Sequence, residues 1–175
     1  MMGMSSREWS RYMHDVIGVL DPPEKINAEV VRRLEALYRE RLPMIPGAIE
    51  AVQRMAERWP LAIASSSNRP IIDLFLELTG TSDLFKATVS SEEVDRGKPA
   101  PDVYLEAARR LGVGPERCVA VEDSENGIGS AAAAGMKMIA IPTAAFPPSD
   151  EALALAAVVL TSLDELQPEL VESLA

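Results

Sequence analysis

The sequence is nearly free of cysteine and histidine, which occur once each, at Cys118 and His14. A single cysteine excludes an intrachain disulfide and a zinc site built from several thiolates. Cys118 opens the apolar run Cys-Val-Ala-Val, where a free cysteine packs like a small apolar residue. His14 lies in a helical stretch, and we interpret it as a surface residue rather than a nucleophile.

Long apolar runs are also missing. Hydrophobic residues make up 47% of the 175 residues, but no segment approaches the ~20 apolar residues that a membrane span needs. The first residues, Met1 to Met13, show neither a basic start followed by an apolar run nor a small-residue cleavage site. We therefore expect no membrane partner and a cytoplasmic location.

Positive charge is scarce, with 17 Lys and Arg against 27 Asp and Glu and a net charge of -10. Such a field repels polyanions, so we expect no nucleic acid partner. A phosphate-bearing ligand must then be held by a local arrangement of groups, most simply with a divalent cation.

The chain divides into two parts by pattern. Apolar residues recur at helical spacing up to about Leu42 and predict an amphipathic helical segment over residues 1–43. Pro43 and Pro46-Gly47 then interrupt the pattern. From residue 44 to 175, helices alternate with short apolar strands, which predicts an α/β domain with a Rossmann-like parallel sheet covered on both faces. The expected strands are 61–64, 87–89, 118–121, 138–141 and 158–160. The expected helices between residues 48 and 134 are 48–58, one from 68 to near 80, 101–111 and 126–134.

In a parallel sheet, ligands bind beyond the carboxyl ends of the strands. Ser65 directly follows the apolar run Leu-Ala-Ile-Ala, and its hydroxyl, with free N–H groups at a helix start, can bind a phosphoryl oxygen. Taken alone, the same residues favour a simple helix cap, in which Ser67 or Asn68 binds the amides of the first turn.

Two further loops carry charged side chains. In Arg-Gly-Lys-Pro-Ala-Pro-Asp, two prolines stiffen the loop and place Lys98 at the edge of the sheet, while Asp102 complements the positive end of the next helix. Glu122 and Asp123 follow the run Cys-Val-Ala-Val, and adjacent carboxylates at a strand end suit Mg²⁺. Each loop also has a structural interpretation: a lysine before a proline-initiated helix, and a solvated acidic turn or an N-cap.

The ordered set is more specific than its parts. A strand ending in Ser, then Gly-Lys-Pro-x-Pro-Asp, then Val-Glu-Asp-Ser-x-x-Gly resembles the haloacid dehalogenase superfamily, and its Glu-Asp-Ser form is similar to the beta-phosphoglucomutase-like and phosphoglycolate-phosphatase-like branch. The opening Met-Gly-Met-Ser-Ser-Arg-Glu-Trp resembles the middle of that branch's helical cap.

The resemblance implies a set of roles. Ser65, Ser66 and Asn68 would bind the substrate phosphoryl group, and Lys98 would balance its charge. Glu122 and Asp123 would ligate or position Mg²⁺. In the cap, Ser5, Ser6 and Arg7 would face the leaving group of a small phosphorylated metabolite.

The family's Asp-x-Asp, which supplies a nucleophile and an acid–base group, occurs nowhere in the sequence. In the family it ends a central strand, between the strands that here end in Ser65 and Glu122. We therefore expect two unpaired strand edges facing a gap, a polypeptide that extends upstream of Met1, and a chain that is inactive as printed.

Several functions are consistent with these features. The resemblance favours a Mg²⁺-dependent phosphatase that forms an aspartyl-phosphate and acts on a small phosphorylated metabolite, either a sugar phosphate or a phosphoglycolate-like compound, with the nucleophile absent from this chain. The alternatives are a non-catalytic phosphate-binding remnant and, when full length, a phosphosugar mutase, for which Arg7 is the residue in question. The spacing Gly127-x-Gly129-x-x-Ala132 also fits a dinucleotide fingerprint, but the acidic loop before it would repel a pyrophosphate. Neither the exact substrate nor the oligomeric state follows from the sequence.

Overall fold

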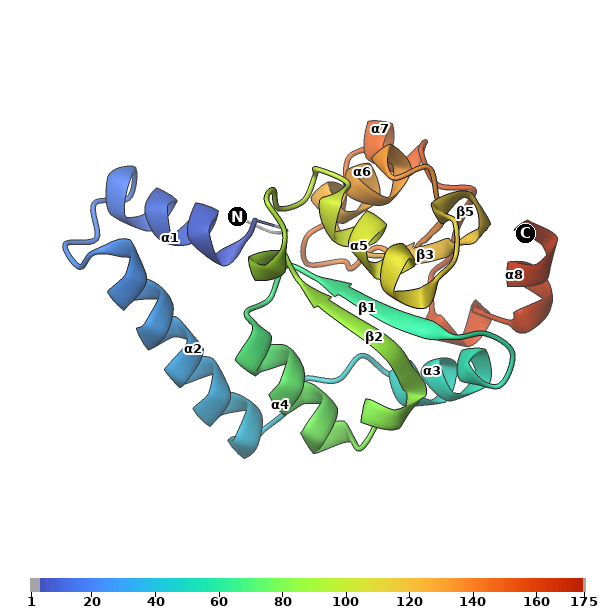
Figure 1. Cartoon of the computed structure of the whole chain (residues 1–175), viewed down its shortest axis with the longest axis horizontal. Helices are drawn as coiled ribbons and strands as arrows, with labels where there is room; N and C mark the ends of the chain where they lie inside the picture. The colour runs from blue at the N-terminus through green and yellow to red at the C-terminus, as the bar shows by residue number, and fades with distance from the viewer. Residues whose placement is uncertain (1–3, 175) are drawn as a thin grey trace.

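The computed structural model describes residues 4–174, which form alternating helices and strands (Figure 1). The helices are α1 (Ser6–Asp15), α2 (Pro23–Glu40), α3 (Ala48–Ala56), α4 (Arg69–Thr79), α5 (Asp102–Leu111), α6 (Glu125–Ala133), α7 (Asp150–Leu153) and α8 (Pro168–Leu174). The strands are β1 (Leu61–Ser65), β2 (Phe85–Ser90), β3 (Val119–Glu122), β4 (Lys137–Ala140) and β5 (Val158–Val159). The five expected strands and the four expected core helices are thus present, with bounds shifted by a few residues, while α7 and α8 had not been expected.

The strands form two separate parallel sheets. β1 pairs with β2, and β3, β4 and β5 pair in that order. The α/β class with parallel pairing is therefore confirmed. Within the described residues β1 and β3 each have a partner on one side only, so the strands that end in Ser65 and Glu122 face each other unpaired, as expected.

Successive side chains of β4 point to opposite faces of the larger sheet, and helices pack on both faces. Met138 and Ala140 of β4 join the core cluster formed with α5 and α6, whereas Ile139 between them joins a second cluster with α3 and the segment before α8. All three side chains are at most 1% exposed. β4 thus has the character of a buried central strand.

The close packing of α6 brings two loops together. Its Ala131 and Ser130 are fully buried, and the Ser130 hydroxyl donates to the carbonyl of Ala100 at 2.6 Å. The loop that follows β2 is thereby attached to the helix that follows β3. This hydrogen bond links elements that follow strands of two different sheets.

The two N-terminal helices lie to one side of the sheets (Figure 1). α1 begins with a capping box between Ser5 and Glu8, and α2 packs on α1 and on α4. His14 is where we expected it, on a helix, and its Nδ1 donates to the carbonyls of Val19 and Asp21 at 2.9 and 3.0 Å, which stabilises the turn between the helices. The division into residues 1–43 and 44–175 stays a prediction.

No helix in residues 4–174 is long and apolar enough to cross a bilayer.

Candidate functional site

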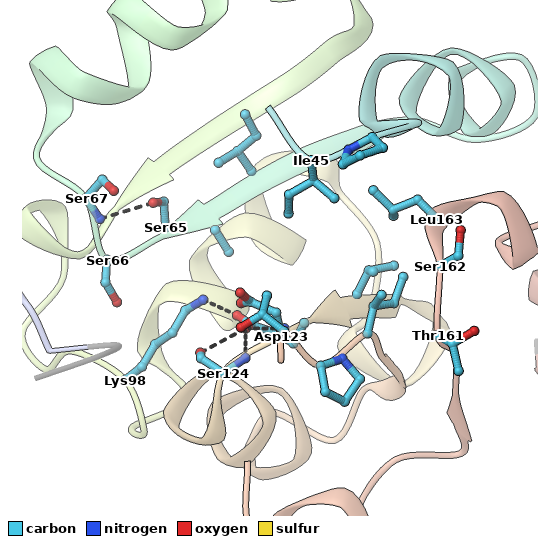
Figure 2. Close-up of a pocket in the computed structure, with 18 residues that line it drawn as sticks. Ile45, Ser65, Ser66, Ser67, Lys98, Asp123, Ser124, Thr161, Ser162 and Leu163 are labelled. Atoms are coloured by element: carbon cyan, nitrogen blue, oxygen red, sulfur yellow. Dashed lines mark hydrogen bonds and ion pairs between the residues drawn. The ribbon is translucent and has the colours of Figure 1, made fainter. Parts of the chain in front are cut away.

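A groove runs between β1 and β3, where the two sheets fail to join (Figure 2). Its volume is about 720 Å³. We call it the central groove; its lining residues are Ile45, Pro46, Ile63, Ala64, Ser65, Ser66, Ser67, Lys98, Val121, Glu122, Asp123, Ser124, Ile141, Pro142, Thr143, Thr161, Ser162 and Leu163. The walls are mainly apolar, and Val121 remains 44% exposed on them. The polar and charged side chains gather where β1 and β3 end.

Ser65 is the last residue of β1 and lines the central groove. Its Oγ accepts a hydrogen bond from the N–H of Ser67 at 3.1 Å, which closes a tight turn after the strand (Figure 2). The helix-cap interpretation of Asn68 is wrong, because the Asn68 side chain makes no capping hydrogen bond to α4. The first amide of that helix instead donates to a carboxylate of Glu92, at 2.9 Å from Arg69 N.

Lys98 is fixed in the loop between β2 and α5. The loop is attached to α6 through Ala100, as described above, and Arg96 pairs with Asp102 in the first turn of α5 at 2.9 Å. The predicted structural role of Asp102 thus includes an ion pair as well as its place at the helix start. Lys98 itself is only 7% exposed and lines the central groove.

The Lys98 ammonium forms a buried ion pair with Glu122 and lies 4.8 Å from the centroid of the Tyr104 ring. The Tyr104 hydroxyl donates to the same carboxylate at 2.6 Å. Burial, followed by the negative charge of Glu122, raises the pKa of Tyr104 well above its ordinary value, so the phenol is a fixed proton donor. Lys98 is therefore held by an anion on one side and an aromatic face on the other.

Glu122 uses both of its carboxylate oxygens within the protein. Oε1 accepts from Lys98 and Tyr104, and Oε2 accepts from the N–H groups of Asp123 and Ser124 and from the Ser124 hydroxyl, at 3.1–3.4 Å. Burial alone would raise the pKa of Glu122. The Lys98 charge and these hydrogen bonds outweigh burial, so the pKa lies below its ordinary value of 4.5. Glu122 is an ionised, internally bound group at neutral pH.

Asp123 lines the central groove beside Lys98 and is half-buried (Figure 2). Burial, together with the adjacent Glu122 charge, raises its pKa above the ordinary 3.8. A carboxylate held at such a place is stabilised by a bound cation, and oxygen ligands of this kind suit Mg²⁺. Asp123 thus fits a magnesium ligand, whereas the oxygens of Glu122 are already occupied. Residues 4–174 contain no group of three His, Cys, Asp or Glu placed to hold a metal, so this part of the chain offers a partial ligand set.

The structure explains why the Val-Glu-Asp-Ser-x-x-Gly pattern has a glycine at its last position, Gly127. A Cβ at this position would lie 2.0 Å from the carboxyl carbon of Glu122. Ser124 caps α6 here, since its Oγ accepts from Gly127 N at 3.2 Å. The Glu122 carboxylate therefore occupies the space that a dinucleotide pyrophosphate would need, and the fingerprint interpretation has no support in the structure.

Three of the predicted substrate-binding residues, Ser6, Arg7 and Asn68, lie outside the central groove. Ser6 is 2% exposed and donates to Glu92 at 2.9 Å, and Asn68 is 6% exposed and donates to Glu92 and Asn27. Arg7 is exposed on α1. Of the predicted residues, Ser65, Ser66, Lys98, Glu122 and Asp123 come together around the central groove, whereas Ser6, Arg7 and Asn68 do not line it.

A second, smaller cavity of about 240 Å³ lies on the other side of the turn formed by residues 65–67, which we call the serine loop. We call it the side pocket; its lining residues are Met4, Trp9, Val30, Leu34, Tyr38, Ser66, Ser67, Asn68 and Ile71. Ser66 and Ser67 line both cavities. The serine loop therefore separates the central groove from α1 and α2.

Sequence reasoning missed Tyr104 and Glu92. The sequence contained a signal for Tyr104, because it lies two residues after Asp102, in the first turn of α5 and close to the loop that carries Lys98. Glu92 had no local signal, because its partner Ser6 is 86 residues away.

Comparisons with known proteins identify phosphatases that are similar in sequence to this chain. Hexitol phosphatase B of Escherichia coli strain K12 is 38% identical over 144 residues, 82% of this chain and 64% of that protein. Fructose-1-phosphate phosphatase YqaB of the same strain is 36% identical over 111 residues, 63% of this chain and 57% of that protein. The chain thus spans less than two thirds of the length of either relative.

Among solved structures, CbbY from Rhodobacter sphaeroides in complex with phosphate superposes with a TM-score of 0.81 at 28% identity, over 94% of this chain and 76% of that one. A family model described as haloacid dehalogenase-like hydrolase matches residues 2–135. The parallel sheets, the serine, lysine and acidic loops at their carboxyl ends and this match together show that the chain belongs to the haloacid dehalogenase-like hydrolases.

Proposed function

We propose that the protein is a Mg²⁺-dependent phosphatase of a small phosphorylated metabolite, in the class of sugar and polyol phosphates. The observation that carries the proposal is the convergence of Ser65, Lys98 and Asp123 at one end of the central groove. A hydroxyl, a buried ammonium and a carboxylate suited to Mg²⁺ are the groups that a phosphoryl dianion needs. The similarity to hexitol and fructose-1-phosphate phosphatases supports the substrate class.

Each residue has a distinct role in this proposal. The Ser65 hydroxyl donates to a phosphoryl oxygen, and Lys98 offsets the negative charge while it stays paired with Glu122. Asp123 is the proposed Mg²⁺ ligand. Glu122 positions it, because its carboxylate accepts from the Asp123 N–H at 3.2 Å. A bound Mg²⁺ would supply charge stabilisation at the phosphoryl oxygens.

The nucleophile is proposed to come from an aspartate on a strand that occupies the central groove. The facing edges of β1 and β3 and the apolar walls support a parallel strand at this place. One aspartate carboxylate attacks phosphorus, and the ester oxygen leaves with a proton from a second carboxylic acid two residues on. Water then attacks the aspartyl-phosphate, the second carboxylate takes up its proton, and inorganic phosphate is released.

The test compares two forms of the protein for hydrolysis of 4-nitrophenyl phosphate, hexitol phosphates and fructose 1-phosphate, each with Mg²⁺ or with a chelator. The 175-residue chain is expected to be inactive. The same chain extended at its N terminus by an apolar strand that ends in Asp-x-Asp is expected to hydrolyse the sugar phosphates only with Mg²⁺. An inactive extended chain, together with a stable fold in the 175-residue chain, would support the phosphate-binding remnant instead.

A further inference from the structure

Glu92 lies where α1 and α2 meet the core, in the short turn Ser91–Glu93 that follows β2. Its Oε1 accepts from the Ser6 hydroxyl at 2.9 Å and from the Asn68 amide at 2.7 Å. Its Oε2 accepts from the N–H of Arg69 at 2.9 Å. One carboxylate therefore joins the start of α1 to the loop that follows Ser65.

Two of the three residues that donate to this carboxylate are buried. Ser6 is 2% exposed and Asn68 is 6% exposed. The Asn68 amide also donates to the Asn27 side chain of α2 at 3.0 Å. Both N-terminal helices are thus connected to the serine loop through Asn68 and Glu92. Hydrogen bonds to a charged, partly buried acceptor are stronger than neutral ones, so the network favours one position of these helices.

The start of α1 contacts the core at a second point, the backbone of Gly97 beside Lys98. A Cβ at Gly97 would lie 3.0 Å from Ser5 Cβ and 3.2 Å from Ser5 N. Such a contact is tighter than an alanine accommodates without movement of α1. The first turn of α1 therefore lies between the turn that carries Glu92 and the loop that carries Lys98.

The neighbouring Glu93 shares Arg69 with Glu92 but binds its guanidinium and not its backbone N–H. It pairs with Arg69 and with Arg110, the latter at 2.7 Å, and its carboxylate also accepts from Ser90 N at 3.1 Å. These partners belong to β2, α4 and α5. Both of these adjacent glutamates contact Arg69, and Glu92 in addition accepts from the Ser6 hydroxyl of α1.

We propose that Glu92 is a positioning residue that holds the first turn of α1 against the serine loop and so keeps Ser66 and Ser67 in place between the side pocket and the central groove. The consequence for substrate rests on the proposed function, but the seating of α1 does not. Glu92 touches no reacting atom; it acts through Ser6 and Asn68, which explains why these two predicted substrate-binding residues are buried in a polar network.

Hydrogen–deuterium exchange of the 175-residue chain tests the seating directly, with Glu92→Gln and the matched control Glu93→Gln. Glutamine keeps the shape but lacks the charge and one acceptor oxygen. We expect amides of α1 and the first half of α2 to exchange about tenfold faster in E92Q, from the loss of a charged acceptor. The amides of α5 and α6 in E92Q, and those of α1 in E93Q, should stay within about twofold of the unchanged chain. Ser6→Ala should shift the same α1 amides by a smaller factor.

Unchanged α1 exchange in E92Q, or an equal effect in E93Q, would overturn the proposal. In the strand-extended protein, E92Q should raise KM for the sugar phosphate by a larger factor than it lowers kcat, and E93Q should change neither much. A fall in kcat alone would contradict a positioning role. Loss of activity in every form would instead count against the proposed function, because the exchange measurement needs no substrate.

Discussion

The Lys98–Glu122 pair offers the sharpest test of the site's electrostatics. Both side chains are 7% exposed, and Lys98→Met removes the cation while it keeps most of the side-chain volume. Breaking a buried pair by removing one partner costs about 3–5 kcal/mol, because it leaves an uncompensated buried charge. For a chain of this length that loss corresponds to a fall in Tm of roughly 6–20 °C.

The pH dependence of the Glu122 contribution to stability should have opposite signs in the unchanged protein and in K98M. In the unchanged protein the pKa of Glu122 is lowered below 4.5, so its contribution to stability is present above about pH 4.5 and is lost as the pH falls through the lower folded value. In K98M only burial and the hydrogen bonds act, and we expect burial to raise the Glu122 pKa above its ordinary value. A folded state that then binds a proton more tightly than the unfolded state gains stability as the pH falls. The deficit of K98M should therefore shrink between pH 7 and pH 5.

The assay is urea unfolding followed by circular dichroism at both pH values, with Lys86→Met on the exposed side of β2 as control. We expect the control to change the unfolding free energy by less than about 0.5 kcal/mol. The double variant K98M/E122Q should regain at least half of the K98M loss, since no buried charge is left. A K98M loss below about 1 kcal/mol, or one that grows at pH 5, would refute the reasoning.

Three further substitutions test separate parts of the site. Asp123→Asn should raise Tm without metal, because the raised pKa of Asp123 marks an unfavourable charge at neutral pH. The same substitution should abolish the Tm increase produced by Mg²⁺, and an increase that persists would exclude Asp123 as a ligand. Gly127→Ala should lower the unfolding free energy by about 1–3 kcal/mol, because the new Cβ clashes with Glu122. In the control Gly129→Ala the Cβ would lie 3.5 Å from Pro99, so this variant should be neutral or stabilised by up to about 1 kcal/mol. Equal effects of the two variants in urea unfolding would contradict this expectation. Ser65→Ala should lower kcat/KM of the strand-extended protein by about 10–150-fold, the loss of one hydrogen bond to a charged group, and an unchanged value would remove Ser65 from the site.

The meeting of Ser65, Lys98 and Asp123 was predictable because it depends on a rule of topology. Ser65 ends β1, Asp123 follows β3 and Lys98 lies in the loop after β2, and in an open parallel α/β fold ligands bind beyond such strand ends. The strand positions followed from apolar runs bounded by turn residues. The facing edges of β1 and β3 were expected as well, though from the family resemblance and not from local pattern.

The contacts of Asn68 were not predictable in the same way. An asparagine at a helix start has a strong local preference for capping, and the sequence favoured that role. In the structure a carboxylate from another loop binds the helix amide and the asparagine side chain together. Such competition is decided by tertiary neighbours, which neither spacing nor propensity encodes. Ser6 was assigned to the substrate from the family resemblance, and in the structure its hydroxyl donates to Glu92.

The central claim is that the phosphoryl group binds between the serine loop, Lys98 and Asp123. A two-dimensional ¹⁵N NMR titration of the 175-residue chain with inorganic phosphate, in the presence of Mg²⁺, tests it most directly. The account predicts chemical-shift changes clustered at residues 65–67, 98 and 123–124, which D123N weakens. Shifts centred on the exposed Arg109 and Arg110 of α5, with residues 65–67 and 98 unchanged, would contradict it.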